Sequence, residues 1–290
     1  MSEVRKGDIV GRKSYDKDVL FKIVDFYMDD GKPMARLKGL HLRLSASSPV
    51  EDLVKMDPSE VAGYLVAQMK RTSEQMKRVF SRRAMEREVI YNRALQTEKN
   101  NIESFDVPGS VLHIDGDSDY LDLCMTTYRQ LQVPANGYNI DEEQQPVQVE
   151  DLLKKHRPDM LVLTGHDGFI KGKQDLRDVN NYYATKFFVE AVQVARRYEK
   201  SLDDLIIFAG ACQSLYEAIL NAGANFASSP KRVLIHAYDP VFVIEKIAYT
   251  SIYDPVPLKE VIAGTITGFD GIGGVETRGK HRLGIPKSVY

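Results

Sequence analysis

Residues 108–290 alternate between short apolar runs and longer amphipathic stretches, and this alternation constrains the fold more than any other feature of the chain. The runs have the length of strands buried on both faces, and the stretches between them have helical periodicity. This pattern predicts an α/β fold, a parallel sheet with helices on both faces. The predicted strands are residues 110–114, 134–140, 160–164, 205–209 and 233–237. The predicted helices are residues 118–131, 149–157, 179–200 and 213–222.

The first 56 residues instead contain only short runs typical of strands. Turn-forming residues at 29–33 and at Gly39 separate these runs. Five short strands in so short a segment favour a small SH3-like β-barrel. The predicted strands are residues 8–12, 19–27, 34–37, 41–44 and 51–56.

A helical linker is predicted between these two regions. Pro58 favours a helix start, because proline fits the first turn of a helix. From there to Asn100 the only glycine is Gly63, and residues 70–87 are strongly basic. The pattern predicts one long helix or a broken pair at the surface. The predicted domains are residues 1–56, 57–104 and 105–290.

Charge and composition exclude several classes of partner and location. A net charge of −2 and a pI near 6.3 give the chain no bulk attraction for nucleic acid. No apolar run reaches the roughly 18 residues of a membrane span, and the N-terminus lacks the apolar core of a signal peptide. The two cysteines, Cys124 and Cys212, favour a reducing compartment over a disulfide framework. We therefore expect a cytoplasmic protein without a metal, a cofactor or a nucleic-acid partner.

Two reactive side chains follow predicted strands. His166 follows the strand at 160–164, and Cys212 follows the strand at 205–209. If these strands are neighbours, both side chains project over the same sheet edge. An imidazole can help a thiol to form the nucleophilic thiolate and can later protonate a leaving amine, and a helix predicted to start at Cys212 would favour the anion. The pair predicts Cys212 as nucleophile and His166 as its acid–base partner.

The residues around this pair suggest donors for an oxyanion. Backbone N–H groups in tight turns can stabilise the negative charge of a tetrahedral intermediate. The candidates are Gly165 and Gly168 beside His166, and Ala211 beside Cys212, together with the N–H of Cys212 itself.

Other interpretations stay open. A cysteine after an apolar strand is often a small buried hydrophobic residue. An α/β-hydrolase-type esterase using Cys212 would need a later histidine, His236 or His281, because that fold places its histidine after the nucleophile. A non-catalytic scaffold, with the N-terminal barrel as its binding module, would need none of these residues.

The order of the motifs resembles the clan of caspases, gingipains and legumains. Members of this clan carry His-Gly and Ala-Cys after successive strands, and His166 and Cys212 are 46 residues apart, near the caspase spacing of about 50. Here Asp167 separates His166 from Gly168, and Gly210 stands where caspases have glutamine. The resemblance therefore implies a caspase-like catalytic domain without the aspartate specificity of caspases.

The chain resembles the YabG family of sporulation-specific cysteine proteases over nearly its whole length. The shared motifs are residues 7–15 (GDIVGRKSY), 112–117 (LHIDGD), 164–167 (TGHD), 208–214 (FAGACQS), 222–230 (AGANFASSP) and 273–279 (GGVETRG). The resemblance implies a protease that is made in the mother cell during sporulation and trims spore coat and cortex-associated proteins. It implies a location in the mother-cell cytoplasm, with association with the spore coat as a second option.

The clan resemblance also implies that the S1 pocket is built partly from the loop after the first strand. Asp115 and Asp117 are the charges available there, and Asp239 is a reserve candidate after the last predicted strand. A buried carboxylate pairs well with arginine or lysine, so we expect cleavage after basic P1 residues. Such an enzyme could also cleave itself within the basic linker, at residues 70–95.

Overall fold

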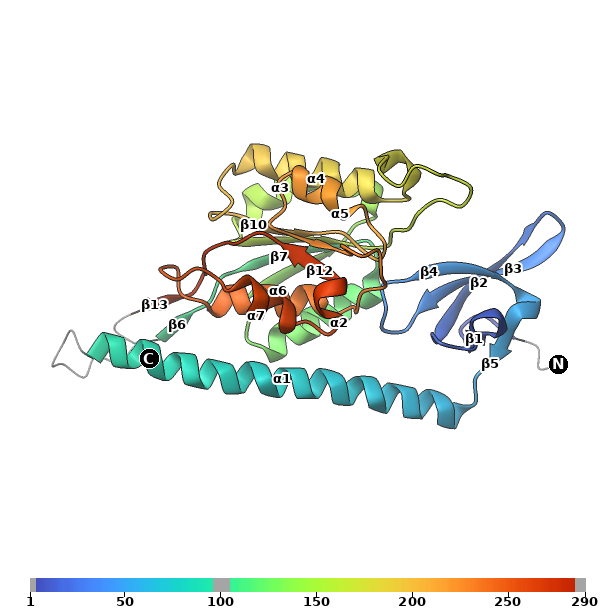
Figure 1. Cartoon of the computed structure of the whole chain (residues 1–290), viewed down its shortest axis with the longest axis horizontal. Helices are drawn as coiled ribbons and strands as arrows, with labels where there is room; N and C mark the ends of the chain where they lie inside the picture. The colour runs from blue at the N-terminus through green and yellow to red at the C-terminus, as the bar shows by residue number, and fades with distance from the viewer. Residues whose placement is uncertain (1–3, 96–104, 285–290) are drawn as a thin grey trace.

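The computed structural model of the chain describes residues 4–95 and 105–284, apart from the side chains of residues 89–95. Within residues 105–284 it contains a six-stranded sheet in the order β12-β11-β10-β9-β7-β8 (Figure 1). Neighbouring strands are parallel except for β12, which is an antiparallel edge strand. The strands are β7 (Val111–Asp115), β8 (Ala135–Asn139), β9 (Met160–Thr164), β10 (Ile206–Ala209), β11 (Phe226–Ser228) and β12 (Ile272–Gly274). The predicted α/β fold with a mostly parallel sheet is confirmed, and its caspase-like character stays a prediction.

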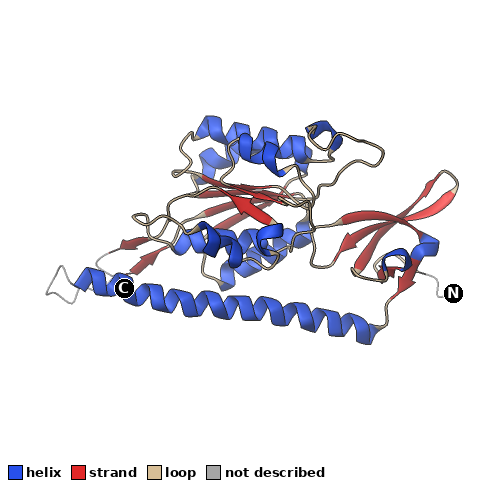
Figure 2. Cartoon of the chain, in the orientation of Figure 1, coloured by secondary structure: helices blue, strands red, loops and turns tan. Residues whose placement is uncertain are grey.

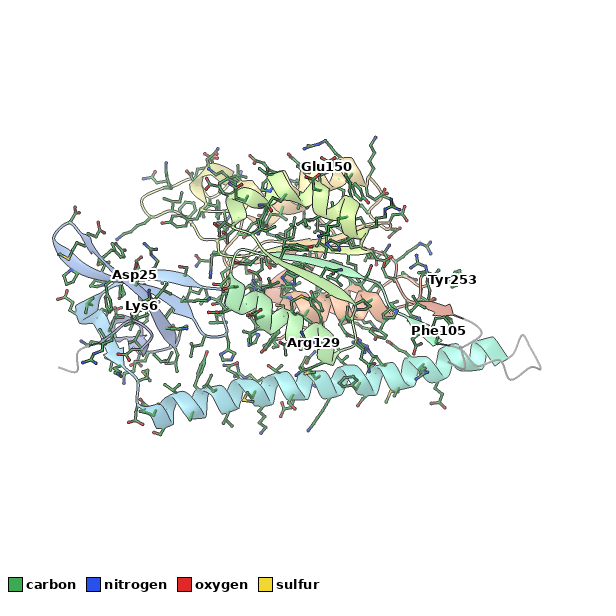
Figure 3. The ribbon with its side chains drawn as sticks, turned by 180° about the vertical axis from the view of Figure 1, so that it is seen from behind. Lys6, Asp25, Phe105, Arg129, Glu150 and Tyr253 are labelled. Carbon is green, nitrogen blue, oxygen red and sulfur yellow. The ribbon has the colours of Figure 1, made fainter. Side chains whose placement is uncertain are left out.

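Helices cover both faces of this sheet, as predicted. One face carries α3 (Gln145–His156), α4 (Thr185–Tyr198) and α5 (Tyr216–Asn221), and the other carries α2 (Ser118–Gln130), α6 (Asp239–Tyr249) and α7 (Leu258–Ala263) (Figure 2). In Figure 3, Glu150 of α3 and Arg129 of α2 accordingly lie on opposite sides of the sheet. Every residue of β7, β9 and β10 is buried, which explains why β9 and β10 are apolar runs.

Two predictions in this region are wrong, and several elements were missed. Residues 233–237 are not a strand of the sheet, because the partner of β10 is the shorter β11. The run at 233–237 is instead an extended segment with an isolated bridge between His236 and Leu42. The helix predicted at 213–222 begins only at Tyr216, and sequence reasoning did not find α6, α7 or β12. The apolar run at 233–237 pairs with a distant part of the chain, which no local pattern reveals.

The N-terminal residues form a five-stranded antiparallel sheet, in the order β4-β3-β2-β1-β5 among the described residues. The strands are β1 (Ile9–Arg12), β2 (Phe21–Asp29), β3 (Lys32–Gly39), β4 (Ser45–Pro49) and β5 (Leu53–Lys55). The strand predicted at 41–44 is wrong, since these residues form a loop, in which Leu42 makes an isolated bridge with His236. The strand β4 was missed because its polar sequence, SASSP, has no apolar alternation. Closure of this sheet into an SH3-like barrel stays a prediction.

The linker is one unbroken helix, α1 (Pro58–Leu95), which runs along the face covered by α2, α6 and α7 (Figure 1). Val79 is buried in the core cluster of that face. The carboxylate of Glu245 on α6 is fully buried and accepts hydrogen bonds from Arg82 Nη2 at 2.6 Å and Arg83 Nε at 2.6 Å. The second half of the basic helix is therefore anchored to the larger domain. Beyond it, β6 (Phe105–Val107) pairs with β13 (Arg282–Gly284).

No helix in the described ranges, 4–95 and 105–284, combines the length and the hydropathy needed to cross a membrane.

Replacing Glu245 by alanine is expected to lower the free energy of unfolding by about 3 kcal/mol, because two arginines lose their buried carboxylate partner. Chemical denaturation of the full chain measures this change. The matched control is Glu88→Ala, which removes an exposed glutamate of α1 and should change the value by less than about 0.5 kcal/mol. Equal values for the two variants would show that this contact does not anchor α1.

Candidate active site

The carboxyl ends of β7, β9 and β10 lie side by side, because β9 pairs with both of the others. Asp115 is opposite Thr164, and Ala209 is opposite Leu163. The loops that carry Asp117, His166 and Cys212 therefore begin at one edge of the sheet. The adjacency that the candidate pair required is confirmed.

Cys212 is fully buried in this structure. Its Sγ accepts a hydrogen bond from the Ile235 N–H at 3.2 Å and lies 3.9 Å from the Ile235 carbonyl oxygen. Burial raises the pKa of the thiol to about 12, although the Ile235 N–H favours the thiolate. The expected helix start at Cys212 is wrong, because Gln213 has a positive φ of 59° and α5 begins at Tyr216. The structure thus holds a neutral, shielded thiol.

His166 is oriented by two carboxylates. Its Nε2 lies 2.8 Å from Asp117 Oδ2, and its backbone N–H donates to Glu142 Oε1 at 2.6 Å. Its ring packs in a T-shaped arrangement with that of Tyr120, with 5.6 Å between ring centroids. The other ring nitrogen, Nδ1, is buried and has no hydrogen-bond partner among the described residues. Asp117 therefore fixes the orientation of the ring. Among the described residues, Nδ1 is the ring nitrogen that has no hydrogen-bond partner.

Asp167 connects the histidine loop to the cysteine loop. It accepts hydrogen bonds from Gly168 N–H at 2.8 Å and from Ser214 Oγ at 2.8 Å. Ser214 Oγ in turn accepts from the Ala211 N–H at 2.9 Å. Two of the expected oxyanion donors, Gly168 and Ala211, are therefore already hydrogen-bonded in this structure. At the third, Gly165, a Cβ would collide with the carboxylate of Glu142, so a larger residue would have to displace that side chain.

Asp115 is fully buried, as is Asp239 among the three candidate S1 carboxylates. Its Oδ2 accepts hydrogen bonds from Arg43 Nη1 at 2.6 Å and from Thr164 Oγ1 at 2.9 Å. Burial opposes its ionisation, but the Arg43 guanidinium and His113 outweigh burial and hold the pKa of Asp115 well below its usual range. The site therefore contains an ionised carboxylate inside the protein, with an arginine as its partner.

The other two candidates have different surroundings. Asp117 caps the first turn of α2 and also bonds to His166 and Lys38. Burial opposes ionisation, but these two partners lower the pKa of Asp117 to about 2. Asp239 is buried at the start of α6, where it accepts hydrogen bonds from the N–H groups of Ile266 and His236. Burial raises the pKa of Asp239. Each of these carboxylates already holds part of the fold together.

The histidines that a hydrolase-type mechanism would use lie in other surroundings. His236 is nearly fully buried, and burial lowers its pKa to about 3. His281 lies 3.1 Å from Asp106, next to the β6–β13 pair. Within the described ranges, no hydrogen bond joins Cys212 to His166, His236 or His281.

Sequence reasoning missed Arg43, Glu142 and Ser214, which contact the residues of the site. Arg43 lies in an alternating run that is typical of a strand, and Glu142 lies in a polar segment before α3. Ser214 was considered only as the last residue of the motif at 208–214. Among the residues that the structure describes, no group of three or more His, Cys, Asp or Glu side chains is arranged to hold a metal ion.

Comparisons with known proteins identify the family of the chain. The family model described as YabG peptidase U57 matches residues 5–286. The sporulation-specific protease YabG of Bacillus subtilis (strain 168) is 42% identical over 283 residues, which cover 97% of each chain. A solution structure of a response regulator protein from Burkholderia multivorans aligns with 41% of this chain and 79% of its own, but a TM-score of 0.25 and 17% identity support no inference. The match over nearly the whole length, and a relative of this identity, show that the chain belongs to the YabG peptidase U57 family of proteases.

Proposed function

We propose that the protein is a cysteine endopeptidase of sporulation, with Cys212 as nucleophile and His166 as acid–base group. Membership of the family supports peptidase activity, and the name of the B. subtilis relative supports a role in sporulation. The assignment of the cysteine rests on one observation: Cys212 and His166 follow adjacent parallel strands at one sheet edge. Asp117 supports it further, because it bonds to the imidazole.

In this mechanism, Cys212 Sγ attacks the carbonyl carbon of the scissile bond while the thiol proton passes to His166. The C–N bond breaks as His166 returns the proton to the leaving amine, and water then hydrolyses the acyl-enzyme. The proton moves through Nδ1, since Nε2 is bonded to Asp117. Asp117 stays ionised because its pKa is about 2, so it stabilises the imidazolium. The N–H groups of Cys212 and Gly165 are our candidates for binding the oxyanion.

We place the S1 pocket at Asp115 rather than at Asp117 or Asp239. Asp117 is needed for His166, and Asp239 bonds to the backbone before and beyond α6. Asp115 is ionised, buried and already bonded to a guanidinium, that of Arg43. These contacts fit a P1 arginine or lysine.

A peptide library tests the proposed function directly. Purified full-length enzyme and its Cys212→Ala variant are incubated with the same library, and the new termini are identified by mass spectrometry. We expect cuts after arginine or lysine that occur only with the wild-type enzyme. Cuts by both proteins would refute a cysteine mechanism at Cys212.

Specificity should depend on Asp115. With wild-type enzyme, kcat/KM for a peptide with P1 Arg should exceed that for P1 Leu or P1 Asp by about 10²–10³-fold, since only arginine pairs the buried carboxylate. Asp115→Asn should reduce this ratio by tenfold or more, roughly the worth of one charge-assisted hydrogen bond. The ratio is the right measure, because any change in the amount of competent enzyme cancels from it.

The control for this change is Asp122→Asn, which removes an exposed carboxylate of α2 and should keep the wild-type ratio. A preference for P1 Asp, or an unchanged ratio in Asp115→Asn, would contradict an S1 pocket at Asp115.

We further propose spore coat and cortex-associated proteins as substrates, in the mother-cell cytoplasm or at the spore coat, on the basis of the family. Self-cleavage within α1 also stays a proposal. Lys70 and Arg71 are exposed there, whereas Arg82 and Arg83 bond to Glu245. We therefore place any such cut in the first, exposed half of the helix.

A further inference from the structure

The loop between β3 and β4 enters the candidate active site from the N-terminal sheet. Leu42 forms an antiparallel bridge with His236. The N–H of Arg43 donates to the Ile235 carbonyl at 3.1 Å, and the N–H of Ala237 donates to the His41 carbonyl at 2.8 Å. Residues 41–43 therefore lie as a short extended strand along residues 235–237.

The side chain of Arg43 fills a closed pocket beneath this strand. It is fully buried, and its Nη1 donates to Asp115 Oδ2 at 2.6 Å. Its Nη2 lies 3.3 Å from Cys124 Sγ and 3.3 Å from the Ala237 carbonyl oxygen. The guanidinium also lies 5.3 Å from the ring centroid of Tyr120. The pocket thus offers an arginine a carboxylate, a carbonyl and an aromatic ring.

One residue, Ile235, connects this strand to the nucleophile. Its N–H donates to Cys212 Sγ, and its carbonyl accepts from the N–H of Arg43. Peptide ligands commonly bind by adding a strand to an exposed backbone edge, with side-chain pockets providing specificity. Residues 41–43 form an extended segment whose arginine lies in an acidic pocket. The N–H of this arginine bonds to Ile235, the residue whose own N–H donates to the thiol. These are the features of a bound substrate.

We propose that residues 41–43 are a built-in pseudosubstrate, which occupies the S1 pocket and the backbone edge that the P3–P1 residues of a substrate require. The inference rests on the proposed function, because it needs Cys212 to be the nucleophile. The enzyme is latent while this pseudosubstrate is in place, and it becomes competent when the N-terminal sheet moves away from residues 235–237.

Three further observations favour this role over a purely structural contact. Cys212 is completely shielded, so a substrate can reach it only after part of the surrounding chain has moved. A buried ion pair such as Arg43–Asp115 also adds little stability compared with apolar packing, so stability alone does not explain its presence. Lys38 of the same unit bonds to Asp117, the carboxylate that orients His166.

The pseudosubstrate also predicts a peptide that fits the cleft. Its sequence places histidine, leucine and arginine at P3, P2 and P1. Acetyl-His-Leu-Arg-aminomethylcoumarin is therefore the probe, and the free acid acetyl-His-Leu-Arg is the matching product-like inhibitor.

The test compares full-length wild-type enzyme with Arg43→Ala and with Arg36→Ala, a control that removes an exposed arginine of β3. An internal competitor lowers the fraction of competent molecules and raises the apparent KM by the same factor. Arg43→Ala should therefore lower KM for the probe by about tenfold or more, with kcat within about twofold of wild type. Inhibition by acetyl-His-Leu-Arg should strengthen by the same factor, and Arg36→Ala should match wild type in both measurements.

Arg43→Lys provides a second variant in case Arg43→Ala does not fold, as judged by circular dichroism. Its ammonium keeps the charge opposite Asp115 but cannot reproduce the contacts of both guanidinium nitrogens, so KM should fall to an intermediate value. A structural role for Arg43 alone would lower thermal stability without lowering KM.

The outcomes separate the two proposals. If wild-type hydrolysis depends on Cys212 but Arg43→Ala and Arg43→Lys keep the wild-type KM, the pseudosubstrate is refuted and the proposed function stands. If no folded variant hydrolyses any peptide, the proposed function fails, and the pseudosubstrate fails with it.

Discussion

Replacing Cys212 by alanine is expected to lower the turnover of peptides with P1 Arg by up to about 10⁶-fold, the loss typical of removing a catalytic nucleophile. The alanine side chain cannot form the acyl-enzyme. Hydrolysis of the coumarin probe measures the loss, with mass spectrometry to detect slow residual cleavage. The removed group is one sulfur atom in a fully buried position, so the fold should persist.

Cys212→Ser is the matched control for this experiment, because it keeps a hydroxyl of similar size at the same position. Its turnover should lie between those of wild type and Cys212→Ala, since a hydroxyl is a much weaker nucleophile than a thiol. Circular dichroism should show the same fold for all three proteins. Full processing of a coat protein by Cys212→Ala would favour the non-catalytic scaffold, with another protease responsible for the cleavage.

Replacing His166 by alanine is expected to lower kcat by about 10²–10⁴-fold, the contribution usual for a general acid–base group. The probe's kcat is measured at saturating concentration, so that changes in binding do not enter. His156→Ala is the matched control. His156 is the last residue of α3, contacts Tyr138 of β8 and plays no part in the proposed mechanism.

The same series includes His236→Ala and His281→Ala, which a hydrolase-type mechanism would make essential. Both should retain more activity than His166→Ala. If either is the more damaging change while His166→Ala stays active, the assignment of His166 is wrong and the esterase alternative gains support.

The central part of the site could be predicted from the sequence because its strands are buried on both faces. Continuous apolar runs at β9 and β10 located the strands, and the polar residues immediately after them were then visible as His166 and Cys212. Parallel pairing then predicted that the two residues lie close together, since it brings the carboxyl ends of neighbouring strands to one edge of the sheet. These are local signals with a simple geometric consequence.

The contact between the two segments that cover the site could not be predicted in this way. Residues 41–44 and 233–237 each have the pattern of a strand, and each was assigned to its own sheet. In fact the two segments pair with each other across about 190 residues of sequence, and no local pattern identifies such a partner. The roles of Asp115 and Asp117 were inseparable for a similar reason. Their roles differ because α2 starts directly after Asp117. Asp117 caps that helix, whereas Asp115 lies before it and bonds to Arg43.

The pairing of Arg43 with Asp115 has a consequence for the evolution of cleavage specificity. A mutation that changed the charge of the pocket would alter which peptides are cut and would also unseat the residue that fills the pocket. A viable change of specificity therefore needs a matching change at position 43, 72 residues away in the sequence. Across related proteins we expect the two positions to vary together, so that residue 43 records the P1 preference of each enzyme in its own sequence.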